Sequence, residues 1–320
     1  MNIIRVSKND NFEYKSKTGD VIKNANTLER IKNIRIPPAW INVLIANNSK
    51  EEVQAIGEDA KGRMQYLYSK EWINNQEKAK FVRLIYFLKN VNYIRKNVKK
   101  ILKEDSWSKE KLIAFIITII DHSGLRIGNE KYEELYDTHG ITTLKKQHIK
   151  MFNNKIELNF IGKKNVINTC TLKNNILIKL FKNLNEYNQP NNDDYFFTIN
   201  CKILSNTSVN NFLKKYGDYT IKDFRTYRAN IDFITCLYNT SFEITEYKIK
   251  RTINKCLDII AERLNNSRSV LKNKYICNII INKYLTEPTQ FYKKIKYYEK
   301  HKSQNLNMYE SGLLYYLKLF

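Results

Sequence analysis

The feature that most constrains the fold is a change of hydrophobic periodicity near residue 78. Before it, side chains alternate in the strand-like manner of Met64, Tyr66 and Tyr68, and the proline pair in "RIPPAW" (35–40) is incompatible with a helix interior. After it, residues 79–104 have the spacing of a helix with a dense basic face. The change predicts a small β-rich domain over residues 1–77 and a larger domain over residues 78–320.

The larger domain is predicted to be mainly helical with one β insert. Residues 108–135 indicate a buried helix that breaks at Ser123-Gly124 and is followed by a second helix. Residues 148–172 alternate between apolar and polar and contain two turn signals, which predicts a three-stranded meander with Lys163 at its second tip. Because helical patterns dominate after about residue 174, the predicted fold class is α+β, with an N-terminal antiparallel β domain.

The chain is strongly basic. Its 320 residues include 55 Lys+Arg and 32 Asp+Glu, a net charge of +23, which is compatible with nucleic acid, an anionic membrane or a need for solubility. The heavy use of Asn, Lys and Ile is typical of an AT-rich genome, with a large DNA virus favoured and a bacterium second, and it inflates the charge. The charge therefore permits a nucleic-acid partner without requiring one.

Membrane insertion and secretion are not expected. The longest apolar run, residues 112–120, is shorter than the about 20 residues that span a bilayer. The segment "MNIIRVSKND" has no apolar core followed by a cleavage site. We therefore expect an intracellular protein without membrane contact.

Cysteine and histidine usage gives no metal signature. The five cysteines are scattered and never in C-x-x-C spacing, so we expect reduced, buried thiols, and the four histidines have no ligand spacing. No metal and no cofactor are predicted. The residues concerned are Cys170, Cys201, Cys236, Cys256, Cys277, His122, His139, His148 and His301.

Four residues in separate segments can share one chemistry. Arg126 follows the helix break, Lys163 lies at the hairpin tip, Arg225 lies in "IKDFRTY", and Tyr275 ends the basic stretch "NNSRSVLKNKY". Each has an ordinary explanation alone, such as helix capping or solubility. Together they suit attack of a tyrosine phenolate on a phosphodiester, because guanidinium groups match phosphate oxygens and a lysine can protonate a leaving oxygen.

Seven segments in the same order resemble one family, the small type IB DNA topoisomerases of large DNA viruses and bacteria. The resemblance spans residues 28–275 and is carried by "LERIKNIRIPPAW", "IGEDAKGRMQYLYS", "GLRIGNEKY", "THGITTLKKQHI", "FIGKK", "KDFRTYRA" and "NNSRSVLKNKY". It implies transient cleavage of one DNA strand, rotation and religation, without ATP or metal.

The resemblance also implies site roles. Tyr275 would be the nucleophile that forms a 3′-phosphotyrosyl link, Arg126 and Arg225 would clamp the scissile phosphate, and Lys163 would protonate the 5′-hydroxyl. Lys222, one helical turn before Arg225, would contribute to the phosphate environment.

Duplex DNA is the implied partner. Gln65, Tyr66 and Tyr68 match groove-contacting positions of the family, and Tyr132 matches a DNA-contacting position in the catalytic domain. The resemblance implies a monomer whose two domains form a C-shaped clamp around DNA.

One position departs from the poxvirus and nuclear enzymes of the family. They have a histidine nine residues before the tyrosine, whereas this chain has Asn266, as bacterial members do. Asparagine can donate a hydrogen bond to a phosphate oxygen but cannot carry a proton. The neighbouring Arg268 adds a cation that we expect to bind backbone phosphate.

Two alternatives remain. A tyrosine recombinase shares the chemistry, but it typically has histidine three residues before the second arginine, where this chain has Lys222. The other alternative is a non-catalytic DNA-binding protein, in which the four residues have no joint role. Tyr284 is the second candidate for the nucleophile.

Overall fold

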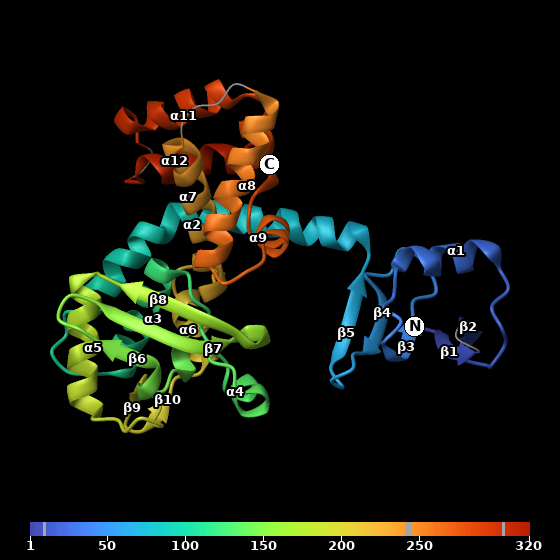
Figure 1. Cartoon of the computed structure of the whole chain (residues 1–320), viewed down its shortest axis with the longest axis horizontal. Coiled ribbons are helices and arrows are strands. Elements are labelled where there is room, and N and C mark those ends of the chain that lie inside the picture. Colours follow the sequence, from blue (N-terminus) through green and yellow to red (C-terminus); the bar gives the residue numbers. More distant parts are fainter. Residues whose placement is uncertain (9–10, 241–244, 303–304) are drawn as a thin grey trace. The chain divides into compact units, whose positions relative to one another are not determined.

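The computed structural model describes residues 1–8, 11–240, 245–302 and 305–320. The chain divides into two compact units, Met1–Lys80 and Phe81–Phe320, and each unit has its own hydrophobic core. The first unit is built on an antiparallel sheet, and the second is mainly helical with a three-stranded and a two-stranded sheet (Figure 1). The predicted α+β class is confirmed.

The first unit contains a five-stranded antiparallel sheet in the order β2-β1-β3-β4-β5, the first part of a long helix that continues into the second unit, and one short helix. Ile31 of the short helix packs with Ile3, Val43 and Ile45 of the strands. The sequence pattern predicted a β-rich domain and did not predict this helix. Ile31 is the only residue of the helix that is buried. The elements are β1 (Ile3–Lys8), β2 (Asn11–Ser16), α1 (Ala25–Ile34), β3 (Ile41–Ile45), β4 (Val53–Glu58) and β5 (Met64–Tyr68).

The long helix α2 (Lys70–Ile101) begins earlier than the periodicity indicated. Its first residues are mostly polar, so no apolar pattern marks the start. The backbone N–H of Trp72 donates to the Ser69 hydroxyl at 3.1 Å, which satisfies one of the unpaired N–H groups of the first turn.

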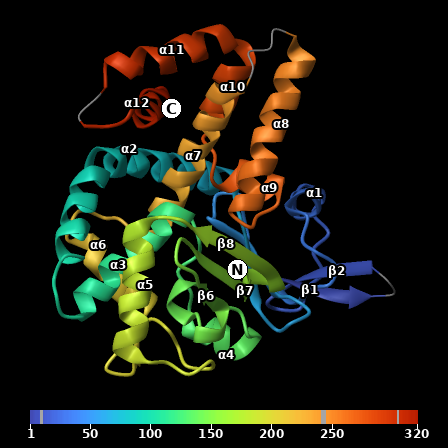
Figure 2. The same cartoon turned by 60° about the vertical axis from the view of Figure 1, so that its left-hand side comes forward.

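The second unit surrounds its core with helices from both ends of its chain. Helix α3 packs against α5, α6, α7 and strand β8, and α12 packs against α7 and α11 (Figure 2). Its other elements are α3 (Lys109–Ser123), α4 (Glu130–Tyr136), β6 (Ile149–Met151), β7 (Ile156–Gly162), β8 (Val166–Leu172), α5 (Asn175–Asn188), β9 (Thr198–Ile199), β10 (Lys202–Ile203), α6 (Asn206–Lys214), α7 (Ile221–Asn239), α8 (Glu246–Arg263), α9 (Arg268–Lys274), α10 (Asn278–Thr286), α11 (Pro288–Lys300) and α12 (Met308–Leu317), with short 3-10 turns at Ile141–Thr143, Lys146–His148 and Lys163–Asn165.

The β insert is the predicted meander. Strands β6, β7 and β8 pair antiparallel in that order, and the turn between β7 and β8 is Lys163–Asn165. Lys164 and Asn165 have φ of 67° and 58°, which closes the turn. The predicted tip is therefore confirmed.

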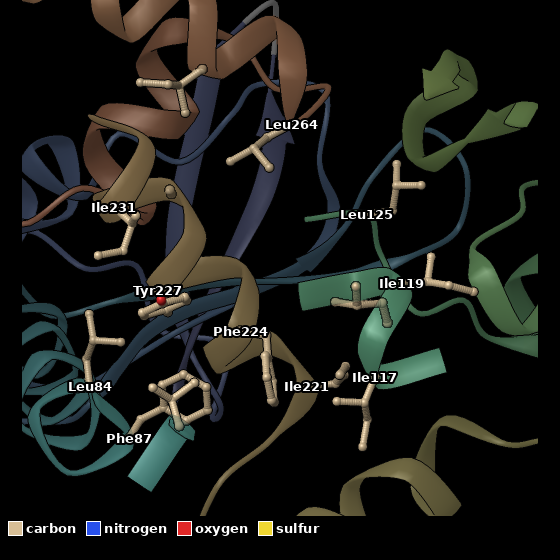
Figure 3. Close-up of a cluster of buried hydrophobic side chains, with 14 of the residues drawn as sticks. Leu84, Phe87, Ile117, Ile119, Leu125, Ile221, Phe224, Tyr227, Ile231 and Leu264 are labelled. Carbon is tan, nitrogen blue, oxygen red and sulfur yellow. The ribbon is translucent and has the colours of Figure 1, made fainter. Parts of the chain in front are cut away.

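Helix α7 runs through the centre of the core. Phe224 and Tyr227 of this helix lie in one cluster with Phe87 of α2 and Ile117 of α3 (Figure 3). The ring of Phe87 meets the ring of Phe224 edge-on, with centroids 4.8 Å apart. Edge-to-face contact is a preferred arrangement of aromatic rings, so it stabilises the packing of α7 against α2.

A buried polar network joins four helices. The Arg95 guanidinium of α2 donates to both carboxylate oxygens of Asp121 in α3, at 2.7 and 2.9 Å, and to Glu310 of α12 at 2.9 Å. The Tyr227 hydroxyl of α7 also donates to Glu310. Because each buried carboxylate has a cationic or hydroxyl partner, the network stabilises one arrangement of the four helices.

The expectation of five reduced thiols is wrong for two of them. Cys236 of α7 and Cys256 of α8 form a disulfide, while Cys170, Cys201 and Cys277 are not part of one. Pairing depends on the packing of α7 against α8, which cysteine spacing does not encode.

Among the described residues, no helix has the length and apolar content needed to cross a membrane.

Candidate active site

Helix α7 begins with a capping arrangement that precedes Arg225. The Thr220 backbone N–H and hydroxyl both donate to Asp223 Oδ2, at 2.8 and 3.0 Å, and Arg83 of α2 pairs with the other oxygen at 2.9 Å. Arg225 follows in the next turn and is only 4% exposed. Both carboxylate oxygens of Asp223 are therefore engaged, one by Thr220 and one by Arg83, and these contacts hold the first turn of α7 in place.

Three contacts hold the Arg225 guanidinium. Its Nη1 donates to the carbonyl of Gly124 and its Nη2 to the carbonyl of Leu264. Its Nε donates to the Tyr275 hydroxyl at 3.3 Å. Since the two carbonyls fix the plane of the guanidinium, the Nε–H bond is directed at the phenol oxygen.

Tyr275 lies at the end of α9. Its backbone N–H donates to Leu271 O at 3.0 Å, and its ring is partly buried against the core. Asn230 of α7 holds the backbone on both sides of Ile276: its Nδ2 donates to Tyr275 O at 2.8 Å, and its Oδ1 accepts from Cys277 N–H at 2.9 Å. The tyrosine is thus held to α7 through both its hydroxyl and its backbone.

Arg126 and Asn266 form a second pair at this site. Arg126 Nη2 donates to Asn266 Oδ1 at 2.8 Å, and the backbone N–H of Asn266 donates to Ala261 O at 2.8 Å. The Asn266 Nδ2 group is buried and has no acceptor among the described residues. An unpaired buried donor costs about 1–3 kcal/mol, so this N–H group is suited to bind an incoming oxygen.

Electrostatics favours ionisation of Tyr275. Burial raises the pKa of the phenol, but Arg225, Arg126 and Lys222 lower it, and the net pKa lies below the ordinary tyrosine value. Burial lowers the pKa of Arg225 to about 10, and the charge of Arg126 acts in the same direction. The site therefore concentrates positive charge around one phenol oxygen.

The other residues predicted for the catalytic unit lie outside this group of contacts. Lys163 is exposed on the β7–β8 turn, with no hydrogen bond or ion pair among the described residues. Tyr132 is 58% exposed on α4, where its ring stacks on Tyr136. Arg268 begins α9 and pairs with Asp258 of α8 at 2.6 Å, so a phosphate would have to compete with that carboxylate.

The three residues predicted to contact DNA in the first unit lie on β5. Tyr66 and Tyr68 are 48% and 37% exposed on one face of the strand, and Tyr68 stacks on Trp72 with centroids 4.0 Å apart. Gln65 faces the other way and donates to Asp59 at 3.0 Å. The face with the two tyrosines offers flat aromatic surface to a ligand.

The described residues contain one group with possible metal ligands. Glu133, Asp137 and His139 each bring one ligand atom within 4.8 Å of the others. The Tyr195 hydroxyl already donates to Glu133 at 2.6 Å, and Lys145 pairs with it at 3.3 Å. Because a lysine neutralises one carboxylate, the group offers a divalent cation a single net negative charge.

Sequence reasoning missed Asn230. It lies five residues after Arg225 and is fully buried. A polar residue on the apolar face of a helix must find partners, and that placement was the available signal. The second candidate nucleophile, Tyr284, is 3% exposed and packs edge-on against Phe291.

The site thus places a tyrosine hydroxyl in hydrogen-bond contact with one arginine and within the electrostatic influence of a second, an arrangement that suits an anionic group. The model of the eukaryotic DNA topoisomerase I catalytic core matches residues 69–305, and the model of the bacterial DNA topoisomerase IB N-terminal domain matches residues 11–59. The chain belongs to the type IB DNA topoisomerases.

Individual relatives agree with the family. The chain is 31% identical to DNA topoisomerase 1B of Acanthamoeba polyphaga mimivirus over 299 residues, covering 90% of this chain and 89% of that protein. It is 27% identical to DNA topoisomerase I of monkeypox virus, covering 79% and 80%. A solved structure of the XerH recombinase bound to its difH substrate aligns with a TM-score of 0.38 and 16% identity, over 72% of this chain and 59% of that one; so low a score does not define a shared fold.

Proposed function

We propose that this chain relaxes supercoiled duplex DNA by cutting one strand, allowing rotation and resealing the cut, through a 3′-phosphotyrosyl intermediate. The observation that carries the proposal is the hydrogen bond from Arg225 Nε to the Tyr275 hydroxyl, beside the Arg126–Asn266 pair. Cationic donors there would stabilise both the phenolate and the phosphate that it attacks.

The proposed reaction is a balanced transesterification. Tyr275 loses its phenol proton to solvent, and its Oη forms a bond to phosphorus while the bond from phosphorus to the 5′ oxygen breaks. Lys163 gives that oxygen a proton, and Arg126, Arg225 and Asn266 donate to the non-bridging oxygens. Lys222 adds positive charge close to Tyr275.

Resealing reverses the same step. After the free 5′ end has rotated about the intact strand, its hydroxyl attacks phosphorus and Tyr275 leaves. Because the phosphotyrosine bond conserves the energy of the broken bond, the proposal requires no ATP. The charge stabilisation comes from side chains, so it also requires no metal and no cofactor.

Duplex DNA is the proposed partner, bound by a monomer inside a cell or virion. Tyr66, Tyr68 and Gln65 on β5, Tyr132 on α4 and Arg268 on α9 are the proposed DNA contacts. One strand is cut once, so a second copy is not needed. Binding should weaken steeply with salt, because contacts to phosphates release counterions.

Supercoiled plasmid incubated with the protein in EDTA, without ATP, tests the proposal. A relaxed ladder from the wild type, with covalent protein–DNA adduct on denaturing gels, is expected. Tyr275→Phe should bind DNA without relaxation or adduct, whereas Tyr284→Phe should retain both activities. Binding without relaxation by the wild type would favour a non-catalytic DNA-binding protein, and strand exchange between two sites would favour a recombinase.

A further inference from the structure

The second unit contains a cavity of 540 Å³ that the proposed reaction does not use. It is lined by residues of α2, α3 and α7 and by the start of α5. Its volume is within the range of small-molecule sites, about 300–1,000 Å³. The cavity is therefore large enough for an organic ligand.

The inner wall of the cavity is apolar. Leu102 and Ile176 give it accessible apolar surface. Behind them Ile94, Val98, Ile117 and Phe224 are almost fully enclosed, each at most 5% exposed. Ile117 and Phe224 belong to the hydrophobic cluster drawn in Figure 3. A ligand with an apolar body would extend this cluster.

The neutral polar side chains in the lining are already engaged within the protein. The Thr118 hydroxyl donates to Ala114 O at 2.8 Å. His122 contacts Thr118 O through Nδ1 at 3.0 Å and Asn174 through Nε2 at 3.2 Å, and Asn174 caps α5. These groups have little capacity to recognise a polar ring such as a nucleobase, so the lining favours an apolar body.

Positive charge at the cavity remains uncompensated. Lys99 near the end of α2 and Lys103 in the turn that follows it are exposed, and their ammonium groups have no ion pair or hydrogen bond among the described residues. The only acid in the lining, Asp121, is occupied by Arg95, and Arg228 pairs with Asp232. The charge of the two lysines is therefore available to an anion.

We propose that this cavity binds a small amphiphilic anion, with an apolar aromatic or branched body and a single carboxylate or sulfonate group. The body would contact Leu102 and Ile176, and the anionic group would lie at the rim between Lys99 and Lys103. Phe224, which is among the lining residues, directly precedes Arg225 in the sequence.

Two fluorescent probes that differ by one sulfonate test the proposal on the full chain without DNA. The anion is 8-anilinonaphthalene-1-sulfonate, and its uncharged counterpart is N-phenyl-1-naphthylamine. The wild type should bind one equivalent of the sulfonate, about tenfold more tightly than the uncharged probe. Equal affinity for the two probes, or binding spread over several equivalents, would overturn the proposal.

Charge reversal locates the anionic group. Lys99→Glu/Lys103→Glu should weaken sulfonate binding at least tenfold and leave the uncharged probe unaffected. Lys96→Glu/Lys100→Glu makes the same change on α2 at exposed positions outside the lining, and it should alter binding less than threefold. An equal loss in both variants would show that the net charge of the protein, rather than the cavity, attracts the probe.

Filling the cavity mouth locates the apolar body. Ile176 lines the cavity and is 50% exposed, so Ile176→Trp should fold normally, with an unchanged circular dichroism spectrum and melting temperature. Calorimetric titration should then show loss of binding for both probes. Unchanged affinity in this folded variant would exclude the cavity as the site.

Discussion

Asn230 of α7 holds the backbone of Tyr275, donating to its carbonyl oxygen at 2.8 Å. The same side chain accepts from the N–H group of Cys277. Helix α7 therefore supplies two contacts to Tyr275: Arg225 contacts the phenol oxygen, and the Asn230 side-chain amide holds the backbone of the tyrosine.

Asn230→Ala should slow DNA cleavage while leaving DNA affinity intact. The substitution leaves the Tyr275 carbonyl and the Cys277 N–H group without their partner, which costs about 1–3 kcal/mol of stability and loosens the nucleophile. Single-turnover cleavage and urea unfolding measure the two effects. The control is Asn273→Ala on α9, whose side chain is exposed and which should change neither.

Gly124→Ala should disturb the site for two reasons, the positive φ at this position and a steric clash of the added methyl group. Gly124 has φ of 68°, and an added Cβ would lie 2.4 Å from Leu264 Cδ2. Both residues offer their carbonyls to Arg225, so cleavage should slow. Gly62→Ala is the matched control, since its φ is 69° and no atom lies within 4 Å of the new Cβ.

The same clash offers a rescue experiment. The double variant Gly124→Ala/Leu264→Ala removes the group that the new methyl would meet. Cleavage should recover in part relative to Gly124→Ala, with single-turnover rates as the measure. If the double variant is no faster, the clash with Leu264 is not the cause of the loss.

The pH dependence of cleavage should reflect the lowered pKa of Tyr275. The rate should rise with pH as the phenolate forms and level off below pH 10, the ordinary tyrosine pKa. Arg126→Ala removes a positive charge that lowers this pKa, so its profile should shift to higher pH. Phenolate absorbance of the wild type compared with Tyr275→Phe reports the ionisation directly.

Protein stability should change with pH in the corresponding direction. The phenol loses its proton more readily in the folded protein than in the unfolded chain. The wild type should therefore gain stability over Tyr275→Phe as pH rises through the folded pKa toward 10, and lose that advantage at lower pH. Urea unfolding at a series of pH values measures the difference.

Lys163→Ala should slow cleavage by about 100-fold or more, because a general acid contributes on that order. A substrate with a 5′-thiolate leaving group needs no proton, so it should restore the rate. Lys164→Ala removes the adjacent lysine of the same turn and should have little effect. Absence of rescue by the thiolate would remove the general-acid role.

Reduction of the Cys236–Cys256 disulfide should destabilise the second unit. The bond closes a loop with a sequence separation of 20, for which the loss is about 3 kcal/mol. Thermal unfolding with and without reductant measures this loss of stability. In Cys236→Ser/Cys256→Ser, the melting temperature should no longer differ between the two conditions. Cys201→Ser changes an exposed free thiol and should leave the difference in place.

Local sequence patterns were sufficient to predict the structural features that neighbouring residues determine. The β7–β8 turn and the helix break at Gly124 follow from turn residues and periodicity, and the structure confirms both. The early start of α2 was missed because its first residues are mostly polar. Helix α1 was missed although Leu28, Ile31 and Ile34 recur at helical spacing, a signal that the sequence contained.

Contacts between distant residues could not be predicted from spacing. Arg225 and Tyr275 are 50 residues apart, and Arg126 and Asn266 are 140 apart, so only their joint chemistry and the resemblance to a family suggested that they share a site. Asn230 and the disulfide were missed for the same reason. Both depend on how α7 packs against neighbouring segments, which no local pattern encodes.

The network around Arg95 has a consequence for biosynthesis. Glu310 follows Arg95 by 215 residues, and at about 5–20 residues per second a ribosome needs roughly 10–40 seconds to cover that interval. Over this interval Asp121 and then Tyr227 are added to the chain, while the last partner of the network is still missing. The nascent protein should therefore be sensitive to proteases until α12 docks, and should acquire resistance in one late step.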